Sequence, residues 1–171
     1  MSDRGQFDFF DEWRLAAESD EVWAVVRDVE SWPEWWPFVL SVTPMTGRTS
    51  PTWEFRFRTR LPYDMVFVVE LLRDDPQVGV EARVAAGTVQ GSGRWRVVAI
   101  EGGTLVHFDF SVRPQLAWMR AVAPVARPVF SWNHRSVMAG GATALARRLA
   151  TRLLADPAGA LLPARRGSRP T

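Results

Sequence analysis

Hydrophobic and polar residues alternate through the middle of the chain, from about Phe38 to Arg113. Within Trp53–Arg58, for example, aromatic and charged residues take turns, which is the two-residue period of a strand with one buried face. Turn signals such as Leu61–Asp64 and Gly102-Gly103 interrupt the alternation at short intervals. Together with a similar pattern in Phe7–Ala17, this predicts six or seven antiparallel strands joined by hairpins.

Two short helices are expected directly after the first strand. Ser19 is placed to cap a helix whose buried stripe is Val22, Val25, Val26 and Val29. Pro33 and Pro37 then leave room for a single tight helical turn, which carries Trp32, Trp35 and Trp36.

A long helix is expected at the C-terminal end. Residues 129–154 contain no proline and are rich in Ala, Leu and Arg, a composition that favours one continuous helix. Pro124 and Pro128 should interrupt any helical turns before it, and Asp156-Pro157 should close it. A strongly curved sheet gripping this helix is the economical way to bury the apolar face, and a gap between the two would form a ligand cavity.

Composition excludes several kinds of chemistry. The chain has no Cys and only two His, so disulfides, thiolate or three-histidine metal sites and cysteine nucleophiles are ruled out. All 21 basic residues are Arg, which also removes Schiff-base lysines. We therefore expect no cofactor and no metal.

Charge and hydropathy bear on partners and location. Six of the arginines and one aspartate fall in residues 140–171, so the rest of the chain is mildly acidic and nucleic acid is not an expected partner. The polar N-terminus lacks the order of a signal peptide, and the apolar region Gln115–Phe130 is too short and broken to span a membrane. These features predict a cytoplasmic protein.

Three stretches carry a family resemblance. They are Glu12–Ala17 with Glu21–Trp23 and Val29–Pro37, then Gly91–Trp95, and finally Trp118-Met119 with Pro124–Met138. They resemble the opening strand and helix pair, a late strand, and the start of the long helix in the SRPBCC superfamily (START, Bet v 1 and polyketide cyclases). The resemblance is to its polyketide cyclase/dehydrase and lipid transport type.

This resemblance implies an α+β helix-grip fold over residues 6–155, in which the curved antiparallel sheet wraps around the long C-terminal helix. Residues 156–171 are expected to form a disordered, Arg-rich tail. The leading hypothesis is binding or transport of a hydrophobic small molecule, such as a lipid, polyketide or aromatic compound, in the cavity. One alternative is a polyketide aromatase/cyclase or dehydratase. Another is a membrane-associated interaction protein that uses the Trp118 region and the tail.

Candidate ligand-binding residues follow from the apolar parities and from the inward stripe of the long helix. They are Trp32, Trp35, Trp36, Phe55, Phe57, Phe67, Trp95, Phe108, Phe110, Phe130, His134, Val137 and Gly141. His134 and Tyr63 are also the catalytic candidates, because an imidazole or a phenol at the cavity can exchange protons. The plainer interpretations are a buried His134 satisfied by a backbone carbonyl or by Asn133, and a Tyr63 ring that packs in a turn.

Other polar residues fit the outer face of the sheet better. Arg56, Arg58 and Arg60 lie opposite the aromatic parity, and only a bulge would turn one of them inward. His107 and Asp109 share a parity but are expected outside, near Arg94 and Arg96, because the flanking Phe residues take the inner face. Gly91 and Gly93 mark a bulge, a bend or room for a ligand.

Overall fold

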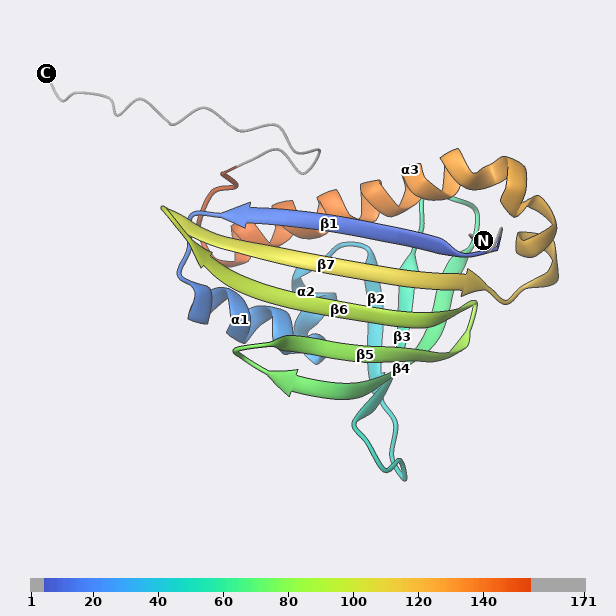
Figure 1. Ribbon diagram of the computed structural model, residues 1–171, viewed down its shortest axis with the longest axis horizontal. Coiled ribbons are helices and arrows are strands. Elements are labelled where there is room, and N and C mark those ends of the chain that lie inside the picture. The colour runs from blue at the N-terminus through green and yellow to red at the C-terminus, as the bar shows by residue number, and fades with distance from the viewer. Residues whose placement is uncertain (1–4, 155–171) are drawn as a thin grey trace, which may run out of the picture.

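The computed structural model describes residues 5–154, which form one seven-stranded antiparallel sheet with its helices on the concave side (Figure 1). The elements are β1 (Phe7–Leu15), α1 (Ser19–Arg27), the 3₁₀ turn η1 (Val29–Ser31), α2 (Trp32–Trp35), β2 (Val39–Pro44), β3 (Thr52–Arg58), β4 (Asp64–Asp75), β5 (Gly79–Gly87), β6 (Val89–Ile100), β7 (Gly103–Pro114) and α3 (Ala117–Arg148). This is the predicted helix-grip architecture, with seven strands. The predicted tail, residues 156–171, lies outside the described residues.

The sheet is a meander from β2 to β7, with β1 added beyond β7 in the order β1-β7-β6-β5-β4-β3-β2. Register shifts in β4, between Val68 and Val69 and between Leu71 and Arg73, accompany its curvature. The predicted parities hold, since the aromatic residues of β3, β6 and β7 face the helices and the arginines of the same strands are exposed. The sheet therefore presents a continuous apolar, concave surface to α3.

The long helix differs from its predicted limits at both ends. α3 starts at Ala117 and runs through both Pro124 and Pro128, although neither proline can donate a backbone hydrogen bond. Burial of Met119 and Ala123 against the rest of the protein holds these early turns in place, and Figure 1 shows the helix bending within this part. The helix ends at Arg148, before the predicted closure at Asp156-Pro157.

The segment after α3 joins the sheet edge instead of continuing the helix. Leu153 forms a β-bridge with Leu15, and the amide of Leu154 donates to the carbonyl of Arg14 over 2.7 Å. Pairing with the free edge of β1 satisfies backbone groups that helical residues would not reach, and this explains why the helix stops early.

The start of α1 also differs from the prediction. Ser19 is the first helical residue and not the cap. The cap is Glu18, which makes no side-chain capping hydrogen bond. The predicted stripe is correct, because Val22 and Val26 are buried and Val25 and Val29 pack against the core. No helix in residues 5–154 is long and apolar enough to cross a membrane.

Candidate functional site

A cavity of about 430 Å³ lies between the concave face of the sheet and the helices. Its walls come from every strand except β2 and from α1, η1, α2 and α3. The cavity falls in the size range of small-molecule sites, and its lining is mostly aromatic and aliphatic. This cavity is therefore the candidate functional site.

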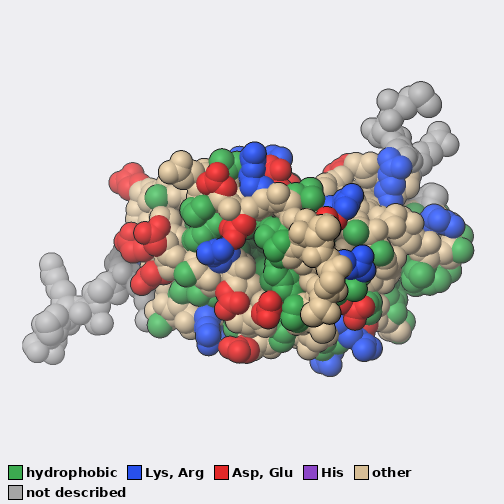
Figure 2. Space-filling view, turned by 90° about the horizontal axis from the view of Figure 1, so that it is seen from below, with side chains coloured by type: hydrophobic (Ala, Val, Ile, Leu, Met, Phe, Trp, Pro, Cys, Tyr) green, Lys and Arg blue, Asp and Glu red, His purple; other side chains and the backbone are tan. Residues whose placement is uncertain are grey.

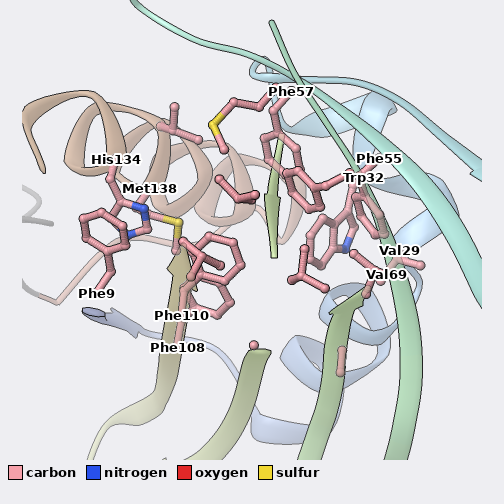
Figure 3. A pocket seen from close by; sticks show the side chains of 18 of the residues that line it. Phe9, Val29, Trp32, Phe55, Phe57, Val69, Phe108, Phe110, His134 and Met138 are labelled. Atoms are coloured by element: carbon pink, nitrogen blue, oxygen red, sulfur yellow. The ribbon is translucent and has the colours of Figure 1, made fainter. Parts of the chain in front are cut away.

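Aromatic rings on the cavity wall form two groups, which are seen on opposite sides in Figure 3. Within each group the ring planes are nearly parallel. The first, the α3 ring group, consists of Phe9, Phe108, Phe110 and His134. The His134 ring is tilted by 9–11° from the other three, and its centroid lies 3.9 Å from that of Phe9. The second, the β3 ring group, consists of Phe55, Phe57 and Phe67, with mutual tilts of 8–16°. Such walls favour a flat, apolar guest.

Eleven of the thirteen predicted ligand-binding residues line this cavity. The two exceptions are Trp35 and Gly141. Trp35 is buried and stacks on Trp36 away from the lining. Gly141 packs directly against the indole of Trp36, where a Cβ atom would come within 2.5 Å of the ring. Both residues therefore serve packing and lie outside the lining of this cavity.

His134 is paired with a carboxylate that the sequence reading missed. Its Nε2 lies 2.6 Å from Oδ2 of Asp11 on β1, and both side chains are largely buried, with 13% and 14% of their surface exposed. Asn133, the partner expected in the plainer interpretation, instead accepts a 2.7 Å hydrogen bond from the amide of Arg60. No described residue bonds to Nδ1 of His134. In the neutral tautomer that carries its proton on Nε2, toward Asp11, this nitrogen is an acceptor.

A sequence signal for Asp11 existed. It shares the inward parity of β1 with Phe9 and Trp13, so an acidic residue is placed on an otherwise aromatic face. A charged residue on a buried parity needs a partner. The helix position that supplies this partner depends on how α3 crosses β1, which the sequence pattern does not encode.

Tyr63 reaches the cavity lining from the loop between β3 and β4. Its ring meets Trp118 edge to face at 5.1 Å, which agrees with the packing interpretation. Burial raises the pKa of the Tyr63 phenol above its ordinary value, so the hydroxyl stays protonated and can donate to a ligand oxygen.

Of the remaining polar candidates, only Arg58 contributes to the lining of this cavity. Arg56 pairs with Asp64 at the surface over 3.0 Å, and the Arg60 guanidinium lies over the Phe38 ring. Arg58 contributes to the lining but is exposed. His107 faces Glu12 across the outer side of the sheet, 3.3 Å between Nδ1 and Oε1.

The sequence pattern also marks three further positions on the strands, Asp109, Gly91 and Gly93. Asp109 lies 4.0 Å from Arg96, as predicted for the outer face. Gly91 approaches the Ser111 carbonyl so closely that a Cβ atom would overlap it. Gly93 lines the cavity, and a Cβ atom there would meet Phe110 at an ordinary contact distance of 3.5 Å. Gly93 thus leaves room for a guest, one of the predicted alternatives.

The cavity reaches solvent where charged residues enter its lining. Arg27 of α1 and Asp74 of β4 both line it and form an ion pair with each other. Beside them, the indole Nε1 of Trp53 on β3 donates to Glu30 of η1 over 2.8 Å. Figure 2 shows a hollow on the face seen from below, with hydrophobic side chains exposed between acidic and basic ones. We call the part of the rim formed by Arg27, Glu30, Trp53 and Asp74 the mouth.

Comparison with known families now identifies the chain. The sequence profile of a family described as polyketide cyclase / dehydrase and lipid transport matches residues 8–153. The chain belongs to this family. Members are expected to enclose a hydrophobic guest, and the enclosed aromatic cavity agrees with this. No curated protein matches the sequence.

Solved structures confirm the fold of this family member. The di-domain aromatase/cyclase BexL of the BE-7585A pathway is 16% identical with a TM-score of 0.69, the match covering 88% of this chain and 52% of that one. The chain thus spans about half of BexL. The Zhui aromatase/cyclase of Streptomyces sp. R1128 is 16% identical with a TM-score of 0.67, covering 85% and 94%.

A START superfamily protein of Mycobacterium smegmatis is also similar, at 19% identity and a TM-score of 0.63, with 85% of this chain and 97% of that chain covered. Aromatase/cyclases and a START superfamily protein thus share the architecture. At these identities the likeness extends to the fold alone, and the function has to be argued from the cavity of this chain.

Proposed function

We propose that the protein binds a flat, hydrophobic small molecule, such as an aromatic polyketide, in the cavity between the sheet and α3. The observation that carries this proposal is the cavity of about 430 Å³ whose wall holds two groups of rings, each nearly parallel within itself. Apolar burial supplies the affinity, and the rings select planar guests. Among the described residues, Asp11–His134 is the only titratable pair that meets the lining deep inside the cavity. It fixes the guest's orientation, because Nδ1 of His134 accepts one hydrogen bond from the guest.

A variant that fills the cavity tests this function. In Gly93→Leu the Cβ atom fits, and the rest of the side chain extends into the space of the guest. The neighbouring Ser92→Leu adds the same side chain on the exposed outer face of β6 and serves as the matched control. Molecules that co-purify with each variant are released by denaturation and identified by mass spectrometry. Affinity is measured by titration with the fluorescent probe 8-anilinonaphthalene-1-sulfonate.

We expect Gly93→Leu to lose the co-purifying molecule and to weaken probe binding by about tenfold or more, because an overfilled pocket must distort to admit a guest. Ser92→Leu should bind as the unmodified protein does. Equal binding by both variants would place the ligand elsewhere, and no binding by the unmodified protein would exclude the function.

The Asp11–His134 pair favours one second candidate, a cyclase or dehydratase reaction on the bound molecule. Nδ1 of a neutral His134 is free to take the proton from a carbon next to a carbonyl group and to return it to a departing hydroxyl, which leaves as water. Asp11 holds Nε2–H and stabilises the imidazolium formed in between. The alternative of pure binding requires no such transfer.

His134→Phe separates the two candidates. A phenyl ring preserves the stack with Phe9 and Phe110 but removes both nitrogens. If the protein is an enzyme, dehydration of an aromatic β-hydroxy ketone should fall by about 10²-fold or more while probe affinity changes little, the usual size of a general acid–base contribution. Absence of turnover by the unmodified protein leaves binding as the function.

A further inference from the structure

Exposed apolar side chains concentrate on the first half of α3. Of the ten large hydrophobic residues exposed among those described, six lie between residues 116 and 132. Val125 is the most exposed of all, with 81% of its surface accessible. We call five of the six the outer stripe: Trp118, Val122, Val125, Val129 and Trp132.

The outer stripe occupies a single face of the helix. Its members are separated by four, three, four and three residues, a spacing that aligns side chains along one side of an α-helix. The inner face of the same turns is already used, since Met119 and Phe130 line the cavity. These turns are therefore apolar on two faces, and only one of the two is covered by the protein.

Charge indicates what covers the second face. Residues 110–155 contain seven arginines and no Asp or Glu, and Arg120 and Arg135 are exposed on α3 itself. A second copy docked by the same face would bring two wholly basic helices together, which like-charge repulsion opposes. An anionic surface is complementary to both the charge and the apolar stripe.

The chemistry of the stripe fits a lipid headgroup layer. Trp is the side chain preferred at the boundary between lipid headgroups and hydrocarbon, and Trp118 and Trp132 stand at the two ends of the stripe. Valines between them give a shallow apolar surface without the length of a spanning helix. Trp118 also touches Tyr63, so the stripe adjoins the cavity wall.

We propose that the outer stripe of α3 docks on an anionic lipid bilayer, with Trp118, Val125 and Trp132 in the headgroup layer. Arg135, which flanks the stripe on α3, would then meet the lipid phosphates. This contact brings the cavity of the protein next to a reservoir of hydrophobic molecules. It does not depend on the cavity being occupied.

The test uses the full-length protein and sedimentation with vesicles of phosphatidylcholine, with or without about one-third phosphatidylglycerol. Val125→Asp places a charge at the centre of the stripe without disturbing a buried contact. Val98→Asp makes the same change at an exposed valine on β6 and is the matched control. Circular dichroism, measured in parallel, reports that each variant is folded.

We expect binding to the anionic vesicles alone, weakened about tenfold or more by Val125→Asp and unchanged by Val98→Asp. Arg135→Gln should weaken it by about fivefold. The proposal is overturned if the unmodified protein ignores anionic vesicles, or if Val125→Asp binds them as well as Val98→Asp does. It is also overturned if light scattering shows a dimer that Val125→Asp dissociates, because the stripe would then be a contact between two copies. Each of these results leaves the proposed cavity function standing.

Discussion

The Asp11–His134 pair persists in an aromatic cavity because each partner satisfies the other where little water reaches. A largely buried carboxylate without a donor, or an imidazole N–H without an acceptor, would be costly. Stacking on Phe9 further fixes the plane of the imidazole, so that Nδ1 has a defined direction. One polar atom is thereby presented at a fixed place in an otherwise apolar wall.

Removing the carboxylate tests this dependence. Asp11→Ala should lower the free energy of unfolding by about 1–3 kcal/mol, because it leaves Nε2–H of His134 without an acceptor. The neighbouring Glu12→Ala removes a carboxylate that meets Arg14 and His107 at the surface, and should cost less than about 1 kcal/mol. Urea denaturation followed by tryptophan fluorescence measures both. Similar losses for the two variants would contradict the structural role of the pair.

At the level of single residues, strand parity predicted most of the cavity lining, because a period of two decides which side chains share a face. Phe55, Phe108 and their neighbours were therefore identified correctly. The pairing of Asp11 with His134 joins residues 123 positions apart. It depends on the crossing of β1 and α3, and no local pattern records that crossing.

Within α3, close contacts with aromatic rings explain two adjacent glycines. Gly141 lets the helix backbone approach the indole of Trp36, which is itself held by a 3.0 Å hydrogen bond from its Nε1 to the carbonyl of Val137. Gly140 faces Phe38 in the same way, but Phe38 is only partly buried. The helix gives up intrinsic stability at both positions in order to pack closely.

The two glycines should respond differently to alanine. In Gly141→Ala the new methyl group meets Trp36 and Trp13, both fully packed, so we expect a net loss of about 1–3 kcal/mol in the free energy of unfolding. In Gly140→Ala the ring of Phe38 can rotate away, and the better helix propensity of Ala, about 1 kcal/mol, offsets the contact. Thermal unfolding by circular dichroism compares them. A loss at Gly140 as large as that at Gly141 would contradict this account.

Elements of this chain were predictable to different degrees for a physical reason. Strands alternate so regularly that six or seven of them, joined by hairpins, were predictable from the sequence, whereas the place of β1 beside β7 was not. The limits of α3 were not, because tertiary burial of Met119 and Ala123 overrides two prolines at its start, and sheet pairing of Leu153 replaces the helix at its end. Local sequence rules describe the intrinsic secondary-structure preference of a segment. Tertiary packing overrides this preference at both ends of α3.

At the scale of the whole molecule, the curved sheet and α3 surround the cavity, and two side-chain contacts span its mouth. The ion pair Arg27–Asp74 joins α1 to β4, and the hydrogen bond from Trp53 to Glu30 joins β3 to η1. Each links a helical element on the concave side to a strand of the sheet. A guest that leaves by this route has to separate them.

Weakening both links should accelerate release of the guest while changing the cavity lining only at the mouth. In the double variant Trp53→Phe/Asp74→Asn we expect the dissociation rate of 8-anilinonaphthalene-1-sulfonate to rise by about two- to fivefold, since exposed pairs of this kind each contribute about 0.2–1 kcal/mol. Glu70→Gln breaks a comparable ion pair, with Arg83, on strands of the same sheet but away from the lining, and serves as the control. Stopped-flow dilution measures the rates. If the double variant releases the probe no faster than Glu70→Gln does, the guest leaves by another route, and the boundary between Tyr63 and Trp118 is the next place to open.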